Sequence, residues 1–271
     1  MQIVGKILLY LIAGAVLLFL IAPILLVMPM AFNQSPYFQF PIEAYSLSWF
    51  RELFGSPTWI QAIYNSIVIA LMSTLLAVSL GTLAAIGLNH HDLPGKRFIM
   101  AVLISPMIVP VVVLAVGSYF FYSKLGIANN LSSIVLIHAV LGMPFVVITV
   151  TASLASFDMK QVWAARGLGA SAWQSFCHVM FPAIWPGVVS GAVFAFITSF
   201  DEVIAVLFLG GPEQNTLPRQ MWAGLREQLS PTILSASFVI ISITTIILLL
   251  ETLRHHRTVK YTVTVPLSLG K

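Results

Sequence analysis

Two adjacent carboxylates, Asp201 and Glu202, lie deep inside an apolar stretch of the sequence. A carboxylate in hydrocarbon costs about 3 kcal/mol or more unless it meets water, protein or a cation. We therefore predict that this pair lines a polar path and attracts a positively charged solute. Asp201 is the favoured member, and Ser199 is close to it in sequence. The alternative is a structural or interfacial pair bound to polar neighbours.

His138 and Tyr119 are the other candidates for a substrate path. His138 lies in a second apolar stretch and is followed by Gly142 and Pro144, which loosen a helix and leave backbone groups to be bonded. The imidazole either forms a hydrogen bond to a neighbouring helix or has a role in the substrate path or in proton transfer. Tyr119 lies near the outer end of a third stretch, where its ring could contact substrate.

Motifs for nucleotide or metal chemistry are absent from the sequence. The pair Gly95-Lys96 has His90 where a phosphate-binding loop needs its first glycine, and Arg97 where it needs a hydroxyl. Neither His-Glu-x-x-His nor Gly-x-Ser-x-Gly occurs, and the single cysteine, Cys177, excludes a multi-cysteine metal site. The sequence predicts no catalytic residues, no metal and no cofactor on this chain.

The composition indicates that lipid surrounds most of the chain. Of 271 residues, 59% are hydrophobic and only 8% are charged, and the mean hydropathy is +0.97. Soluble domains carry about 25% charged residues, so the composition excludes a soluble enzyme, a disordered chain and a nucleic-acid-binding module. The 13 Lys and Arg against 9 Asp and Glu give a pI near 9.3, and the basic residues are too scattered for a phosphate-binding stripe.

Six apolar stretches are long enough to cross about 30 Å of hydrocarbon as helices. The first is too long for a signal-peptide core and is interpreted as a retained helix. Two outer connections, 33–59 and 210–231, are predicted to hold short amphipathic helices. The six predicted spans cover residues of about 7–32, 60–88, 98–122, 131–156, 183–209 and 233–250.

Basic residues predict the orientation of these spans, because Lys and Arg favour cytoplasmic loops. Nine of the 13 fall on the side of the two termini, which we therefore place in the cytoplasm. Those nine are Lys6, Lys96, Arg97, Lys160, Arg166, Arg254, Arg257, Lys260 and Lys271, and the outer four are Arg51, Lys124, Arg219 and Arg226.

The inner loop 157–182 is too polar to span lipid and too apolar to be a linker. Met159–Leu168 is rich in helix formers, Gly169 interrupts it, and Ser171 can cap a second helix that starts at Ala172. We expect Pro182 to end that second helix and to open the next span. The apolar residues Trp173, Phe176, Cys177 and Val179 are expected to pack back on the bundle.

The same loop resembles the "EAA" loop of the membrane subunits of ATP-binding-cassette (ABC) importers. Ala164-Ala165, three residues, Gly169, nine residues and Val179-x-Phe181-Pro182 follow that pattern, although Trp163 replaces the Glu of the family and Phe181 its Leu. The six spans, Pro106 and Pro110 in the third, and the stretch 198–202 resemble the second permease of spermidine/putrescine-type importers.

This resemblance implies an all-α membrane protein with the type I ABC importer permease fold, forming a single permease domain over residues 1–271. It implies that the 158–182 loop couples the chain to a cytosolic ATPase dimer, which binds ATP and Mg. A second, related permease and an extracytoplasmic solute-binding protein complete the expected transporter in a bacterial inner membrane. The expected ATPase-coupling residues are Trp163, Ala164, Ala165, Arg166, Gly169, Ala170 and Ser171.

Several alternatives remain open at this point. The solute could be a polyamine-like cation, or an opine, another amine, a phosphonate or a metal ion, because a fold does not fix a substrate. A stand-alone secondary transporter should show an internal repeat and more intramembrane charge, and neither is visible in the sequence.

Overall fold

The structure is a computed structural model that describes the backbone of residues 2–90, 93–227 and 230–262, and the side chains of 5–90, 93–226 and 230–253. Lys271 and the side chains of Arg254, Arg257 and Lys260, which enter the orientation count, lie outside the described residues. Helices and connecting loops make up the described chain, and an isolated bridge joins Asn33 to Tyr45. The chain divides into two compact units, residues 1–60 with 220–243, and residues 61–219 with 244–271.

The first unit contains α1 (Gln2–Met30), α2 (Ser48–Gly55), most of α11 (Leu217–Glu227) and the beginning of α12 (Thr232–Thr262). Helices α2 and α11 occur within connections 33–59 and 210–231, where short amphipathic helices were predicted. The rings of Phe32, Phe50 and Phe238 pack with centroids 5.0 to 5.7 Å apart. The hydroxyl of Ser235 donates to the carbonyl of Ala31 over 3.2 Å, which ties α12 to the end of α1.

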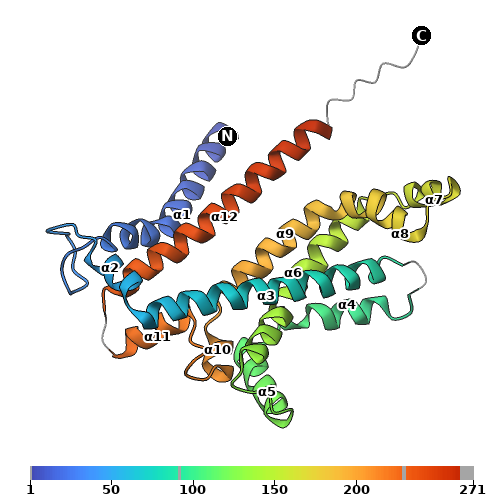
Figure 1. Cartoon of the computed structure of the whole chain (residues 1–271). Helices are drawn as coiled ribbons and strands as arrows, with labels where there is room; N and C mark the ends of the chain where they lie inside the picture. The colour runs from blue at the N-terminus through green and yellow to red at the C-terminus, as the bar shows by residue number, and fades with distance from the viewer. Residues whose placement is uncertain (1, 91–92, 228–229, 263–271) are drawn as a thin grey trace. The chain divides into compact units, whose positions relative to one another are not determined.

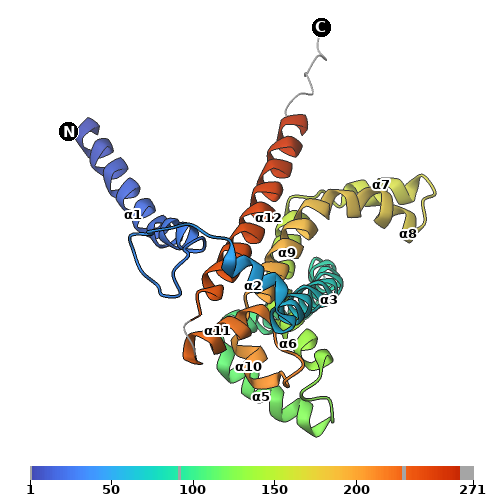
Figure 2. The same ribbon diagram turned by 60° about the vertical axis from the view of Figure 1, so that its left-hand side comes forward.

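The second unit is built around α6 (Leu131–Ala155) and α9 (Phe181–Phe200), which lie side by side in both views (Figures 1 and 2). Glycines permit this close approach: a Cβ atom on Gly187 would lie 2.2 Å from Ser153 Oγ, and one on Gly191 would lie 2.6 Å from Thr149 Oγ1. Around this pair are α3 (Pro57–Leu88), α4 (Lys96–Ile104), η1 (Ser105–Met107), α5 (Val111–Lys124), α7 (Lys160–Gly167), α8 (Ala172–Ser175), η2 (Phe176–Met180), α10 (Ile204–Leu209) and the end of α12.

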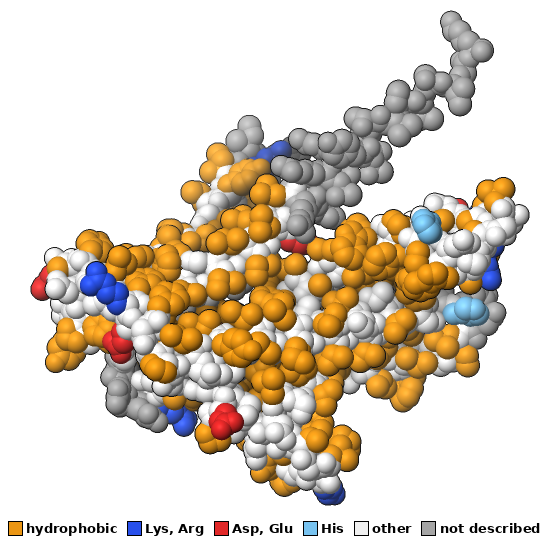
Figure 3. Space-filling model, viewed as in Figure 1, with side chains coloured by type: hydrophobic (Ala, Val, Ile, Leu, Met, Phe, Trp, Pro, Cys, Tyr) orange, Lys and Arg blue, Asp and Glu red, His pale blue; other side chains and the backbone are white. Residues whose placement is uncertain are grey.

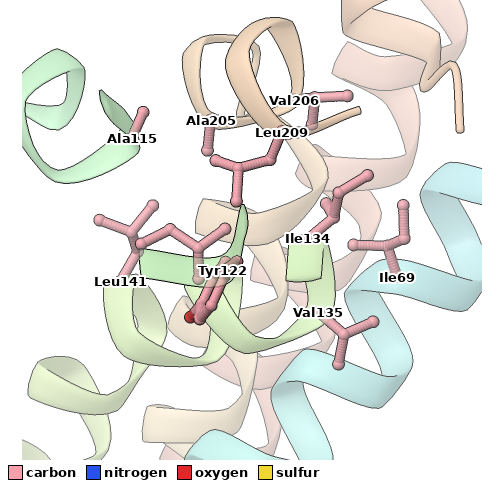
Figure 4. Packing of buried hydrophobic residues seen from close by; sticks show 10 residues of the cluster. Ile69, Ala115, Tyr122, Ile134, Val135, Leu141, Ala205, Val206 and Leu209 are labelled. Atoms are coloured by element: carbon pink, nitrogen blue, oxygen red, sulfur yellow. The ribbon is translucent and has the colours of Figure 1, made fainter. Parts of the chain in front are cut away.

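The two ends of the α6–α9 pair carry different structures. Helices α7 and α8 lie at one end, and α5 and α10 at the other (Figure 1). At the α5–α10 end a buried apolar cluster joins α3, α5, α6 and α10, and Leu209, Val206, Ile134 and Tyr122 are among its members (Figure 4). Apolar side chains cover most of the visible surface of the second unit, and its basic and histidine side chains in that view gather near α7 and at the tip of α5 (Figure 3).

Within the described residues, five helices are long and apolar enough to cross a membrane: Gly5–Met30, Pro57–Leu88, Leu131–Ala155, Ala172–Phe200 and Thr232–Leu253. The third predicted stretch is instead a pair of helices, Lys96–Met107 and Val111–Lys124, which meet at a bend of 100°. Pro106 and Pro110 explain the break, because proline lacks the backbone N–H that continues a helix, and Pro110 itself has a non-helical ψ of 129° just before α5.

The fifth predicted span also differs from the structure at both ends. It was expected over 183–209, but the helix is continuous from Ala172 to Phe200 and a separate short helix follows at Ile204–Leu209. Pro182 causes no break, because it occupies the first turn of α9 and a π-helical turn, η2, connects α8 to it. The fold nevertheless confirms an all-helical membrane protein with up to six spans.

Candidate coupling surface and substrate path

The α7–α8 loop is built by local sequence signals. Helix α7 begins and ends within one residue of its prediction, and Gly169 adopts φ +96°, a conformation that favours glycine. Ser171 Oγ accepts from the Gln174 N–H over 3.2 Å, and Gln174 Oε1 accepts from the Ser171 N–H over 2.8 Å. This reciprocal capping box fixes the start of α8.

Aromatic rings continue the loop into α9. Trp173, Phe176, Phe181 and Trp185 form a ladder with successive centroid distances of 5.6, 5.7 and 5.4 Å. Phe176, Cys177 and Val179 are half-buried, but the prediction that Trp173 packs on the bundle is wrong, since its side chain is 71% exposed. The indole contacts the ring of Phe176 at the start of the ladder and is otherwise largely exposed.

The loop presents an apolar surface flanked by polar groups. Trp163 is 65% and Leu168 91% exposed. Beside them is an open groove of about 500 Å³, lined by Ala165, Leu168, Gly169, Ala170, Gln174, Ser175, His178 and Val179. Ala164, Arg166 and Ser171 are exposed, whereas Ala165 and Ala170 are half-buried in the groove wall. The structure therefore brings the seven predicted coupling residues together on one loop.

Asp201 and Glu202 lie at the break between α9 and α10, at the other end of α9. Asp201 is the residue after the last helical position and its side chain is exposed. Glu202 is half-buried, and its Oε1 accepts the Ala205 N–H over 3.0 Å. The expectation that both acids lie inside one helix is wrong, because Glu202 caps a new helix. Asp201 is therefore the more accessible of the two carboxylates.

His138 and Ser199 form a buried polar cluster just before this break. His138 Nδ1 lies 2.8 Å from Ser199 Oγ, and the Ser73 hydroxyl donates to Ser199 Oγ over 2.9 Å. All three side chains are buried, and His138 Nε2 has no partner among the described residues. The cluster links α3, α6 and α9, so the structure supports the interhelical hydrogen bond that was one of the two readings of His138.

Tyr119 is half-buried on α5 and packs against the apolar cluster that contains Val206 and Leu209. It therefore lies at the α5–α10 end with Asp201. The loop after α10 is held at the same end: Asn65 Nδ2 donates to the carbonyls of Glu213 and Asn215 over 2.8 Å each, and the Leu217 N–H donates to Ser66 Oγ over 2.8 Å. Sequence reasoning missed this anchor, since nothing in the sequence indicates which polar residues of a long helix meet a distant loop.

Arg219 contributes to the same loop. Its Nη1 donates to the carbonyl of Gly211 over 2.8 Å, and burial lowers the pKa of the guanidinium from its ordinary value. The guanidinium remains charged because its ordinary pKa is so high. This contact closes the loop between α10 and α11 on itself.

Sequence reasoning also missed Glu251. The last apolar stretch was expected to end at Leu250, but the apolar part of α12 extends to Leu253 and includes this carboxylate. The hydroxyl of Ser190 on α9 donates to Glu251 Oε1. The residues after Leu250 continue to favour a helix, and this pattern could have indicated that the span includes Glu251.

Comparison with known proteins now identifies the family. Residues 77–259 match the family described as "Binding-protein-dependent transport system inner membrane component". The chain belongs to this family. It is therefore an ABC importer permease subunit of the inner membrane, a non-catalytic and cofactor-free component of a transporter whose ATP is bound by an ATPase subunit.

Among curated relatives, the spermidine/putrescine transport system permease protein PotC of Haemophilus influenzae is 29% identical over 83% of this chain and 88% of its own length. The molybdate/tungstate transport system permease protein WtpB of Pyrococcus furiosus is 30% identical over 66% of this chain and 72% of its own. A bacterial alginate ABC transporter, solved in complex with an alginate-bound periplasmic protein, matches with a TM-score of 0.71 and 19% identity over 95% of this chain and 96% of that chain. These matches confirm the predicted permease fold.

Proposed function

We propose that this permease subunit conducts a small polyamine-like cation and receives the driving force from a cytosolic ATPase dimer at the α7–α8 loop. Asp201 carries the substrate part of the proposal, because it is an exposed carboxylate at a helix break, at the end of α9 remote from α7 and α8. A carboxylate in that position attracts a cation and is stabilised by it. The likeness to PotC, whose name states spermidine and putrescine, supports the same class of solute.

An oxyanion is the second candidate, because WtpB has a comparable identity to this chain. The charge at the break argues against it. Asp201 and Glu202 present two carboxylates, and Ser199 and His138 are already engaged with each other within the buried cluster. An oxyanion would be repelled by these acids rather than bound by them.

The substitution Asp201→Asn tests the substrate proposal. In vesicles that contain the complete transporter, we expect uptake of labelled putrescine to fall between about 10-fold and about 150-fold, since a lost contact between charged groups is worth roughly 1.5–3 kcal/mol. The matched control is Glu213→Gln, which neutralises an exposed acid of the outer loop. Unchanged putrescine affinity and rate in Asp201→Asn would refute the role of this carboxylate.

The coupling part of the proposal rests on the exposed apolar loop. Trp163, Leu168 and Trp173 expose large apolar areas next to an open groove, and such a patch with polar flanks marks a protein-docking surface. Trp163 replaces the family's Glu, so we propose that docking here depends on apolar contact and on Arg166, with no carboxylate at that position. The α7–α8 loop, which is fixed by the turn at Gly169 and the capping box at Ser171, would then transmit movement of the ATPase to α6 and α9.

The remaining partners and the orientation belong to the same proposal. A related second permease and an extracytoplasmic binding protein would complete the path, with both termini of this chain in the cytoplasm. Labelling tests the orientation in a Cys177→Ala background. We expect a membrane-impermeant thiol reagent added outside to modify Lys124→Cys but not Ser171→Cys, and the reverse pattern would overturn the orientation.

A further inference from the structure

Glu251 of α12 is a carboxylate in a helix that is long and apolar enough to cross a membrane. It lies within the apolar stretch Thr232–Leu253 and is half-buried. The Ser190 hydroxyl of α9 donates to its Oε1, so the position of the carboxylate relative to α9 is defined.

The helix geometry gives the depth of this carboxylate along α9. Ser190 precedes Asp201 by 11 residues, which corresponds to about 16 Å along the helix axis. Ser190 also follows His178, an exposed residue at the coupling-loop end, by 12 residues, or about 18 Å. Glu251 therefore lies about midway between the coupling-loop end and the Asp201 end, where apolar residues precede and follow Ser190 on α9.

Within the part of the chain that the structure describes, Glu251 accepts a hydrogen bond from Ser190. An ionised carboxylate offers about four lone-pair sites, and among the described residues only the Ser190 hydroxyl bonds to it. No described Lys, Arg or His side chain pairs with it. A hydrogen bond that served only to join α9 to α12 would not require a charged acceptor, because a neutral amide accepts the same hydroxyl.

We propose that Glu251, held by Ser190, is a second cation-binding position on the substrate path, which receives an ammonium group of the substrate after it leaves Asp201. This inference rests on the proposed polyamine function and extends it from one acidic position to two. A four-carbon diamine is much shorter than the separation of about 16 Å along α9. The two carboxylates would therefore bind it in succession, which prevents a single tight site from trapping the solute.

The test compares variants of the complete transporter in vesicles that take up labelled putrescine. Glu251→Gln keeps an acceptor for Ser190 but removes the charge, and we expect it to lower uptake about tenfold. Glu251→Asp retains the charge and should restore a substantial part of the rate. Ser190→Ala leaves the carboxylate in place and should reduce uptake less than Glu251→Gln does. The amount of assembled complex should stay near wild type in Glu251→Gln.

Three outcomes would overturn the inference. If the wild-type transporter takes up putrescine and Glu251→Gln takes it up equally fast, Glu251 does not bind the substrate, and the proposed function still holds. A loss of assembled complex in Glu251→Gln that matches Ser190→Ala would make the contact purely structural. If Arg254→Gln lowers uptake equally and the double variant restores it, Glu251 serves an internal ion pair. A wild-type transporter that takes up no polyamine would instead refute the proposed function and this extension together.

Discussion

The substitution Leu168→Ala gives the sharpest test of the coupling surface, because this side chain is 91% exposed and contributes almost no packing within the chain. The change removes three carbon atoms, and each buried methylene contributes about 0.8 kcal/mol. Full burial against an ATPase would therefore lose about 2.4 kcal/mol and half burial about 1.2 kcal/mol, which corresponds to a Kd raised between about 7-fold and 50-fold.

The assay titrates the detergent-purified permease with the ATPase subunit and measures the Kd. The matched control is Leu125→Ala, since Leu125 is also exposed, follows the end of α5 and lies at the opposite end of the α6–α9 pair from the α7–α8 loop. We expect the control to bind like wild type, and we expect both variants to unfold at the wild-type temperature because surface substitutions change stability by no more than about 0.5 kcal/mol. A Kd for Leu168→Ala within twofold of the wild-type value would refute the docking of this residue.

Two further substitutions test the loop and the helix pair. Ser171→Ala removes the acceptor for the Gln174 N–H, so the first turn of α8 should lose about 1 kcal/mol and hydrogen exchange at Gln174 should accelerate about fivefold, whereas Ser171→Thr should preserve protection. Gly187→Ala places a Cβ 2.2 Å from Ser153 Oγ and 2.7 Å from the Thr149 carbonyl, so the yield of folded protein should fall sharply, while Gly117→Ala, with nothing within 4 Å, should not change it. Equal yields for the two alanine variants would contradict the close packing of α6 and α9.

The sequence predicted the start, the end and the glycine turn of helix α7 and the serine cap of α8, because these signals are local. Gly169 at positive φ and the Ser171–Gln174 capping box each depend on a few neighbouring residues. The apolar stretches also predicted which segments enter the membrane, because hydropathy measures the preference of a segment for lipid over water.

The helix breaks and the contacts between helices could not be predicted from the sequence. Hydropathy does not distinguish a straight span from the 100° bend at Pro106–Pro110, nor a continuous helix from the α9–α10 break that Glu202 caps. The Ser73–Ser199–His138 cluster and the Ser190–Glu251 contact join residues more than 60 positions apart, and their pairing depends on how helices rotate about their axes. Such rotation is set by packing across the whole bundle.

Cross-linking tests the central claim most directly, namely that the α7–α8 loop touches the subunit that hydrolyses ATP. In a Cys177→Ala background, Leu168→Cys should form a cross-linked product with the ATPase subunit in assembled transporter, and its yield should change when ATP is bound. Leu125→Cys should form none. A transporter that accumulates solute with ATP, yet gives no ATPase cross-link at position 168, would contradict this account.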